Sequence, residues 1–381
     1  MSERPLKVLL VSHYYPPHVG GIENVVHREA MALTARGAEV TVLTSADRSS
    51  TTVEDGVRVV RVAAWNGAER RAGVPFPLFS PALLTVAPRL ARRADVVHIH
   101  DCLYLSSWAA GLAARLTGTP YVLTQHVALV DHPSGLVRSV QRAVYGGPGR
   151  ALLRGAGAVF TLNASVARFV RRHGVREHRA HHLANGVDTT HFRPAVSTAE
   201  RALARRRFGL PTDRVLVLFV GRLVPKKGYD LLLTAHTPDA GYDLVLCGDG
   251  DTRALRGRQG VHHLGAQSPE AVAHVYRACD VFALPSTAEG FPLTVQEAMA
   301  SGLPVVTTDD PGYAPYLLDR DRVSLLPRDR SELVRTLAEL TVDPERRTLM
   351  GAYSRTYAEK AFAWDDHVQT LLAHYRGGTR G

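Results

Sequence analysis

The chain has 381 residues, which is enough for two domains that each bury a core, and its 45% hydrophobic and 22% charged residues are typical of a globular protein. No apolar run reaches the roughly 18 residues of a membrane-spanning helix. The polar start at Met1–Leu6 lacks the pattern of a secretion signal, so we expect a cytoplasmic protein. The formal net charge is +10, and residues 1–190 carry nine of these excess charges, with 22 Lys and Arg against 13 Asp and Glu. This asymmetry indicates an anionic partner for the first half or a generally arginine-rich composition.

Short Val-rich runs alternate with helix-length segments along the whole chain. The strands predicted in the first half are Lys7–Val11, Glu39–Thr44, Val57–Val62, Asp95–Ile99, Tyr121–Thr124 and Ala158–Leu162, with a helix at Asn24–Arg36. Those predicted in the second half are Val215–Val220, Asp243–Cys247, Val281–Leu284 and Leu303–Thr307. Continuous apolar strands are covered on both faces, and strand–helix alternation predicts parallel sheets with right-handed crossovers. The expected fold class is therefore α/β, with two Rossmann-like, doubly wound domains.

The domain boundary is expected after the turn Asn185–Asp188, which a polar stretch follows. This gives a first domain at residues 1–190 and a second at 191–362. A break near Ala363–Asp366 in the last helical segment would let residues 363–381 return to the first domain. Two doubly wound domains imply a ligand in the cleft between them, at the carboxyl ends of the strands.

The loop after the first predicted strand ends in Gly20-Gly21, directly before a helix. Adjacent glycines let a ligand approach the backbone, and a helix N-terminus offers free N–H groups and partial positive charge to an anion. The loop does not contain the G-x-G-x-x-G pattern of dinucleotide-binding enzymes, which disfavours a dehydrogenase. A glycine turn with no ligand is the alternative for this motif.

Two cations follow the first strand of the second domain. Arg222 comes directly after Val215–Val220, and Lys227 lies five residues further on. A fork-shaped guanidinium and a compact ammonium suit the two phosphates of a diphosphate. The alternative is a solvated basic loop.

The segment from Pro285 to Pro304 carries the densest pattern. A strand ends at Leu284, and a helix is expected to begin with Pro292 at its first position and to end at Gly302. The N–H groups near the start of this helix are then available to a phosphate. Glu289 and Glu297 flank that start, and carboxylates accept hydrogen bonds from the vicinal hydroxyls of a sugar or a ribose.

These motifs together resemble the retaining glycosyltransferases with two Rossmann-like domains, known as GT-B, and specifically family 4. Glu289 and Glu297 match the family's E-x7-E motif, and its G-R-x4-K-G stretch is matched by Gly221, Arg222, Lys227 and Gly228. Further matches are the N-terminal double glycine, the turn at Asn185–Asp188 and the loop Gly248-Asp249-Gly250. The resemblance spans roughly residues 6–375.

The resemblance implies a role for each matching residue. Arg222 and Lys227 would hold the donor diphosphate, Glu297 the ribose, and Glu289 a hydroxyl of the transferred sugar. His126, which follows a predicted strand, would lie near that sugar, and Glu23 and Asn163 are candidates for the acceptor side. The remaining donor-binding candidates are Gly20, Gly21, Gly248, Gly250, Gly290, Phe291, Pro292 and Leu293.

The resemblance also predicts the chemistry. The protein would move a sugar from a nucleotide-diphosphate sugar to an acceptor hydroxyl with retention. Uridine is the expected base because it is the commonest in the family, and guanosine is the next alternative. Fixed cations and a helix N-terminus would stabilise the leaving diphosphate, so no metal and no further cofactor is expected. The cysteines, Cys102, Cys247 and Cys279, have no metal-site spacing and are expected to be buried, and Asp309-Asp310 is expected to form a turn.

Other interpretations stay open. A nucleotide-sugar epimerase on the same fold would need a first-domain carboxylate such as Asp95, Asp101 or Asp131. A non-catalytic protein could grip an anionic surface with the basic half, where two predicted short helices contain Arg138, Arg142, Arg150 and Arg154. The same arginines would give an enzyme a peripheral contact with a membrane. The acceptor could be a small molecule, a glycan or a lipid-linked sugar, and nucleic acid is not expected.

Overall fold

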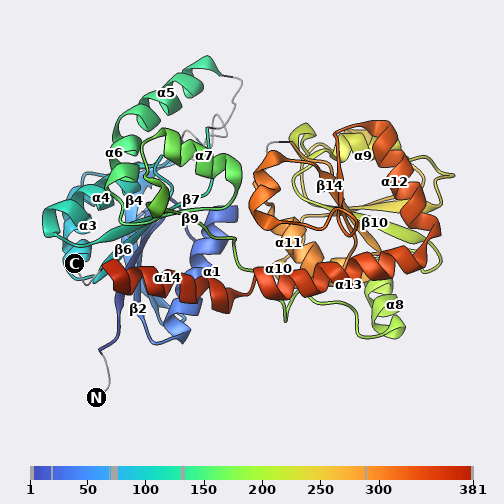
Figure 1. The fold of residues 1–381 in the computed structure, drawn as a ribbon, viewed down its shortest axis with the longest axis horizontal. Coiled ribbons are helices and arrows are strands. Elements are labelled where there is room, and N and C mark those ends of the chain that lie inside the picture. The colour runs from blue at the N-terminus through green and yellow to red at the C-terminus, as the bar shows by residue number, and fades with distance from the viewer. Residues whose placement is uncertain are drawn as a thin grey trace. The chain divides into compact units, whose positions relative to one another are not determined.

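The computed structural model describes residues 4–18, 20–67, 69, 76–129, 134–287 and 290–378. It divides the chain into a first unit, Met1–Asn185 with Trp364–Gly381, and a second unit, Gly186–Ala363 (Figure 1). The expected boundaries after residues 190 and 362 are therefore displaced by five residues and one residue. The reason is that Val187 donates its N–H to Phe362 O at 2.8 Å and bridges Ala363, which joins residues 186–190 to the second unit.

The first unit contains one large sheet with helices on both faces. Its strand order is β3-β4-β2-β1-β6-β7-β8-β9, with the short β5 added on β4, and every pairing is parallel except those of β3 and β5 with β4. Its strands are β1 (Lys7–Val11), β2 (Glu39–Ala46), β3 (Ser50–Glu54), β4 (Val57–Trp65), β5 (Leu78–Phe79), β6 (Val96–His100), β7 (Tyr121–Gln125), β8 (Val159–Thr161) and β9 (Ala180–His182). Its helices are α1 (Gly21–Ala35), α3 (Leu83–Ala91), α4 (Leu105–Thr117), α5 (Gly135–Gly146), α6 (Pro148–Gly155), α7 (Ala164–Arg172) and α14 (Trp364–Gly378).

The second unit contains an all-parallel sheet in the order β12-β11-β10-β13-β14-β15. Its strands are β10 (Val215–Val220), β11 (Tyr242–Cys247), β12 (Val261–Gly265), β13 (Val281–Leu284), β14 (Val305–Thr308) and β15 (Ser324–Leu326). Its helices are α8 (Thr198–Arg207), α9 (Tyr229–Ala235), α10 (Pro269–Ala278), α11 (Leu293–Ala300), α12 (Arg330–Val342) and α13 (Pro344–Ala361). The short 3-10 turns η2 (Pro225–Lys227) and η4 (Pro311–Tyr316) follow β10 and β14.

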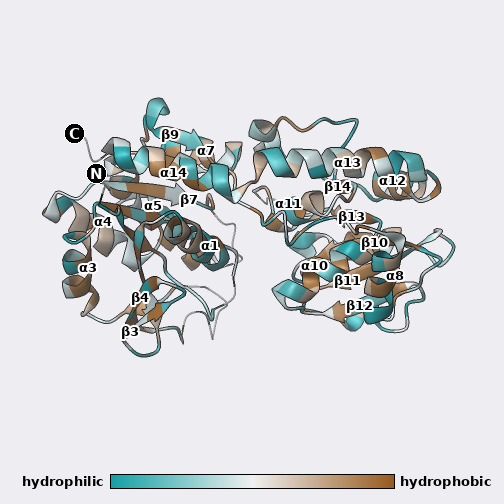
Figure 2. Cartoon of the chain, turned by 90° about the horizontal axis from the view of Figure 1, so that it is seen from below, coloured by the Kyte–Doolittle hydropathy of each residue, from teal (hydrophilic) through white to brown (hydrophobic). Residues whose placement is uncertain are grey.

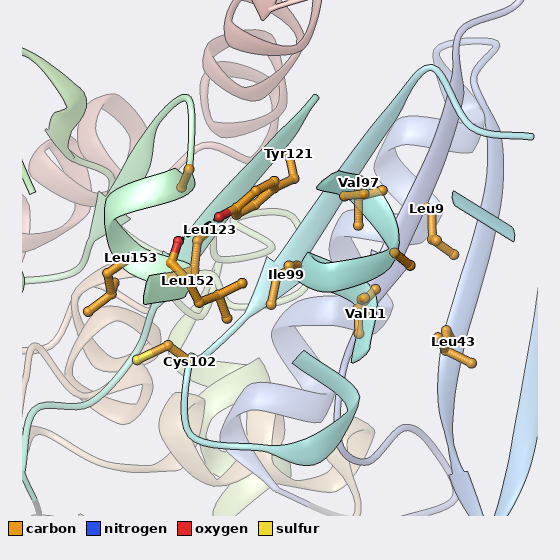
Figure 3. Close-up of a cluster of buried hydrophobic side chains, with 14 of the residues drawn as sticks. Leu9, Val11, Leu43, Val97, Ile99, Cys102, Tyr121, Leu123, Leu152 and Leu153 are labelled. Carbon is orange, nitrogen blue, oxygen red and sulfur yellow. Dashed lines mark hydrogen bonds between the residues drawn. The ribbon is translucent and has the colours of Figure 1, made fainter. Parts of the chain in front are cut away.

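Alternation along β1 shows why a Val/Leu run forms a central strand here. Val8 and Leu10 belong to one buried cluster and Leu9 and Val11 to the other, so both faces of the strand are covered. Figure 3 shows the second of these clusters, in which Leu9, Val11, Val97 and Ile99 lie on the same side of the sheet. In Figure 2 much of β10 and β11, inside the second unit, is coloured as hydrophobic.

The last helix, α14, completes the core of the first unit. Its residues Val368, Leu371 and Tyr375 are fully buried in the cluster that covers the other face of β1, where α1 also packs. Each strand expected from the sequence is present, with ends that shift by at most three residues. No helix among the described residues is both long and apolar enough to cross a membrane.

Candidate active site

In each unit the chain changes its winding direction at one strand. β10 pairs with both β11 and β13, and β1 pairs with both β2 and β6. The loops that leave the carboxyl ends of such a pair diverge, and ligands of doubly wound sheets bind at that point. The loop after β10 carries Arg222 and Lys227, and the loop after β13 leads to Phe291 and Leu293. The loop after β1 carries Gly20, whereas His126 follows β7, which β6 separates from β1.

Glycines let the loops after β10 and β11 touch through their backbones. Gly221 donates its N–H to Cys247 O at 2.9 Å, and Leu223 donates to Asp249 O at 2.8 Å. A Cβ on Gly248 would lie 1.9 Å from Gly221 O, and one on Gly250 would lie 2.7 Å from Leu223 O. The two glycines are therefore explained by the close approach of the two loops. Their donor-binding role remains a prediction.

Arg222 and Lys227 belong to the same loop but differ in their surroundings. The Arg222 side chain is exposed and has no hydrogen-bond or ion-pair partner among the described residues. Lys227 is half-buried, and its Cδ lies 3.8 Å from the position of a Cβ on Gly221, so the lysine stem runs along this loop. The loop thus presents a guanidinium to solvent at the switch point of the second unit.

The turn before α11 differs from the expected one by one position. Pro292 is the N-cap, with φ −63° and ψ 139°, and Leu293 begins the helix, because the proline lies in extended rather than helical backbone. The N–H groups of Leu293 and Thr294 have no acceptor among the described residues, which fits an anion site at the helix N-terminus. Phe291 is buried and stacks on Tyr316 with ring centroids 4.0 Å apart, so its side chain anchors the turn.

Glu297 lies on α11 and is held by a tyrosine that sequence reasoning missed. Tyr276 of α10 donates its hydroxyl to Glu297 Oε2 at 2.9 Å and also lies 3.1 Å from Thr294 O. Burial, followed by the charge of Glu297, holds the pKa of Tyr276 well above its ordinary value, so it remains a donor. Only the contact across two helices reveals this tyrosine, since nothing around it in the sequence forms a motif. Glu289 lies outside the described residues, next to Gly290.

In the first unit, the amino end of α1 is covered by the protein's own carboxylate. A Cβ on Gly20 would lie 2.2 Å from Glu23 Oε2, so glycine makes room for this folded-back side chain. Glu23 Oε1 lies 3.4 Å from His18 Nδ1 and 3.7 Å from His13 Nε2. Burial raises the pKa of Glu23 above its ordinary value. A Cβ on Gly21 would meet nothing within 4 Å. An anion that binds at this end of the helix would have to displace the Glu23 carboxylate.

His126 is buried at the end of β7, and the Asp101 carboxyl lies against its backbone N–H group. Gln125 donates its amide to Asp101 and, at 2.8 Å, to Val127 O. Burial raises the pKa of Asp101 to about 8, although the backbone N–H groups of His126 and Val127 and the Gln125 amide favour the carboxylate. Burial also lowers the pKa of His126 to about 3, so this imidazole is neutral at physiological pH.

Asn163, a candidate for the acceptor side, caps a helix. Its side-chain oxygen accepts the N–H of Val166 at 2.9 Å, and the residue is buried at the start of α7. Helix capping accounts for an asparagine at this position. Its acceptor role remains a prediction.

One group of described residues has the composition of a metal site. Glu29, His98 and His100 are buried, and one ligand atom of each lies within 4.8 Å of the others. Both ring nitrogens of His98 already have partners, however, in Tyr375 and Thr124.

The three cysteines are buried, and burial raises the pKa of Cys247 to about 12. Asp310 caps η4 by accepting the Gly312 N–H, and Asp309 pairs with Arg320 at 2.9 Å.

The carboxylates that an epimerase would need are placed poorly for that role. Asp95 pairs with Arg4 at 2.7 Å and accepts the Lys7 N–H at 2.9 Å, at the amino ends of β1 and β6 and so away from the loops described above. Asp101 is fully buried against the backbone N–H groups of His126 and Val127, in the loop after β7. Asp131 lies outside the described residues.

The chain resembles solved structures over nearly its whole length. It aligns with sucrose-phosphate synthase from Thermosynechococcus elongatus with a TM-score of 0.75 and 21% identity over 98% of both chains. It aligns with Anabaena HepE, solved in complex with UDP-glucose, with a TM-score of 0.75 and 17% identity over 98% of this chain and 100% of that one. Two Rossmann-like units of this topology define the GT-B class of glycosyltransferases.

The family follows from the sequence comparisons. Residues 200–357 match the model of the glycosyl transferases group 1, and residues 20–186 match a glycosyl transferase 4-like domain. The D-inositol 3-phosphate glycosyltransferase of Xylanimonas cellulosilytica is 32% identical over 95% of this chain and 92% of that protein. The enzyme of the same name from Mycolicibacterium smegmatis is 30% identical over 98% and 91%. The chain belongs to the family 4 glycosyltransferases, and it is an enzyme of that kind.

The glycine in the loop after β10 gives a test of this geometry. Gly228 has φ +80°, and a Cβ there would lie 2.2 Å from Pro285 O in the loop after β13. We expect Gly228→Ala to lower the free energy of unfolding by about 1–3 kcal/mol through backbone strain, and by roughly as much again because the two loops must separate. Denaturant unfolding measures both contributions together.

Gly209→Ala is the matched control. Gly209 also has a positive φ, +64°, but a Cβ there would meet nothing within 4 Å. It therefore reports the strain alone. Equal losses in the two variants would show that the loops after β10 and β13 are not in contact.

Proposed function

We propose that this enzyme transfers a sugar, with retention, from a nucleotide-diphosphate sugar to a hydroxyl of a small anionic acceptor. One observation supports the proposal most directly: neighbouring loops of the second unit carry the Arg222 guanidinium and the N–H groups of Leu293 and Thr294, which have no acceptor among the described residues. Both belong to the switch point of one sheet, where a diphosphate would meet fixed positive charge. We propose uridine as the base, by analogy with the UDP-glucose complex of the structural neighbour.

The acceptor proposal rests on the relatives and on charge. The relatives with the identities given above are named for D-inositol 3-phosphate, a phosphorylated polyol. Residues 1–190 carry most of the excess positive charge of the chain, which suits an acceptor with a phosphate group. We therefore propose a phosphorylated polyol as the acceptor class and the first unit as the part that binds it.

The proposed mechanism stabilises the leaving group with fixed charges. As the sugar–phosphate bond breaks, negative charge grows on the diphosphate, and Arg222, Lys227 and the amino end of α11 would stabilise it. The sugar becomes positively charged at its anomeric carbon. A donor phosphate oxygen would take the proton of the acceptor hydroxyl on the same face, which gives retention without a side-chain base. No metal and no further cofactor enters this scheme.

A transfer assay tests the function directly. We expect a UDP-sugar and D-inositol 3-phosphate to yield a glycosylated product and UDP in the presence of excess EDTA, because the proposed cations belong to the protein. Product and donor are separated by chromatography, and the anomeric configuration is read by NMR. Conversion of the donor to an epimer would support the rival enzyme, and a strict requirement for Mn²⁺ or Mg²⁺ would rule out the metal-free scheme.

The two cations give a second prediction. Arg222→Ala and Lys227→Ala should each lower kcat by about 10²–10³, the cost of removing one preorganised group that stabilises developing charge. Lys226→Ala is the control, because it removes the same charge from the neighbouring position. Turnover at saturating donor is the measurement, and normal rates in both Arg222→Ala and Lys227→Ala would refute the diphosphate assignment.

Glu297 gives a third prediction. If it binds the ribose hydroxyls, Glu297→Ala should weaken binding of UDP by about 10- to 100-fold, the value of hydrogen bonds to a charged group. It should hardly affect deoxyuridine diphosphate. Calorimetric titration of both nucleotides measures the preference. An unchanged preference for the ribonucleotide in the variant would place ribose recognition elsewhere.

A peripheral contact with an anionic membrane is a separate proposal. Arg142, Arg150 and Arg154 are exposed on α5 and α6, while the apolar side chains Val144 and Leu152 are buried, so the contact would be electrostatic. Each basic residue near an anionic surface contributes about 1 kcal/mol. We expect salt-sensitive co-sedimentation with anionic vesicles that the triple alanine variant loses. Equal binding to neutral vesicles would refute it.

A further inference from the structure

Buried ionisable side chains form a row inside the first unit, from the start of α14 to the end of β7, and we call this row the relay. Glu29 of α1, His100 of β6 and His367 of α14 are each at most 5% exposed, and His126 is 6% exposed. The proposed transfer mechanism uses none of these side chains, and the family resemblance places only His126 near the transferred sugar. Groups this deep require compensating hydrogen bonds, and the proton positions that satisfy them can be assigned one after another.

The relay begins at His367, whose two ring nitrogens both face hydrogen-bond acceptors. Nδ1 lies 2.7 Å from Ala184 O, which can only accept, and Nε2 lies 2.9 Å from Glu29 Oε1. Burial alone would raise the pKa of Glu29, but His100, His367 and His98 outweigh it and hold this pKa well below its ordinary value. Glu29 is therefore ionised, and His367 donates from both nitrogens as an imidazolium.

The second oxygen of Glu29 fixes the next ring. Glu29 Oε2 lies 3.3 Å from His100 Nε2 and 3.7 Å from His98 Nδ1, so His100 is the nearer of the two rings that face this oxygen. Neither Glu29 Oε2 nor His100 Nε2 makes a hydrogen bond to any other described residue. A nitrogen lone pair facing a buried carboxylate would be repelled, so the proton of His100 sits on Nε2. The remaining nitrogen, His100 Nδ1, then carries a lone pair.

That lone pair sets the ring of His126. His100 Nδ1 and His126 Nε2 lie 3.0 Å apart, and the two rings are stacked with an interplanar angle of 22°. Since His100 Nδ1 can only accept, His126 Nε2 must donate. His126 is then a neutral Nε2–H tautomer, and its Nδ1 offers a lone pair that has no partner among the described residues.

The neighbouring His98 is not part of the relay. Its Nδ1 lies 2.6 Å from Tyr375 Oη and its Nε2 lies 2.7 Å from Thr124 Oγ1, so both nitrogens are satisfied. A metal bound by Glu29, His98 and His100 would have to break the bond to Tyr375. It would also need a lone pair on His100 Nε2, where the carboxylate requires a proton. An arrangement without a metal therefore keeps both bonds of His98, whereas a metal would break one of them.

We propose that Glu29 and His100 are positioning residues that hold His126 as the Nε2–H tautomer, so that its Nδ1 accepts a hydrogen bond from a substrate hydroxyl. Such a nitrogen recognises an O–H donor and repels a phosphate oxygen. The relay itself follows from the first unit alone, and only the sugar or polyol identity of the hydroxyl rests on the proposed function. His367, as imidazolium, balances the charge of Glu29.

The tautomer can be read in the unmodified, full-length protein. Long-range ¹H–¹⁵N NMR distinguishes protonated from unprotonated ring nitrogens, and His126→Gln assigns the signal. We expect Nε2 protonated and Nδ1 unprotonated in His126, and both nitrogens protonated in His367. A proton on His126 Nδ1, or one bound metal ion per chain by elemental analysis, would overturn the relay. This measurement needs no substrate, so it stands even if the proposed activity fails.

Three variants separate positioning from packing. Glu29→Leu removes the acceptor, so the His126 signal should become a tautomer mixture and kcat should fall about five- to tenfold, as for one oriented hydrogen bond. Glu29→Gln should restore both, because its amide can donate to a neutral His367 while its oxygen faces His100. Tyr375→Phe changes the same buried cluster outside the relay and should leave the His126 tautomer unchanged. A tautomer that is insensitive to Glu29→Leu, or equally disturbed by Tyr375→Phe, would refute the assignment.

Discussion

The winding of the parallel strands in the two sheets is the constraint on which the rest of this structure depends. A strand buried on both faces, such as β1 or β10, must be followed by a helix that crosses over one face, and the next strand can be added on only one side. When the chain begins adding strands on the other side, two loops diverge at the carboxyl ends of neighbouring strands. In the second unit these are the loops after β10 and β13, and they contain Arg222 and the amino end of α11. The position of the candidate donor site thus follows from strand order.

Sequence reasoning predicts this framework because each central strand is a continuous apolar run and each functional loop follows one. It missed the two-residue β5 and the edge strands β3, β9, β12 and β15, which carry polar residues such as Thr51 and His262. An edge strand is paired on one side only and often faces solvent, so its residues need not form an apolar run. The register of a neighbour then stabilises it.

The site residues divide in the same way. Residues such as Arg222, Gly248 and Glu297 could be selected from the sequence because each belongs to a motif of only a few neighbouring residues. Tyr276 and the relay of Glu29, His100 and His367 could not, since their partners are distant in sequence: His367 and Glu29 are 338 positions apart. A lone histidine in a strand is usually a satisfied core residue, and only the distances show which groups satisfy it. Pro292 was misplaced by one position for a local reason, because its ψ is extended.

The placement of α14 has a consequence for the order in which the chain acquires its structure. Val368, Leu371 and Tyr375 fill the core of the first unit, yet they are translated after the whole of the second unit, Gly186–Ala363. While the ribosome makes residues 186–363, the first sheet has one face that still lacks these side chains, and Glu29 lacks His367. The second unit is continuous in sequence and can close its core as it emerges. The first unit to be synthesised is therefore the last to be completed, and a cell that stalls late in this message holds a nascent chain with an open apolar face and a buried carboxylate without its counter-ion.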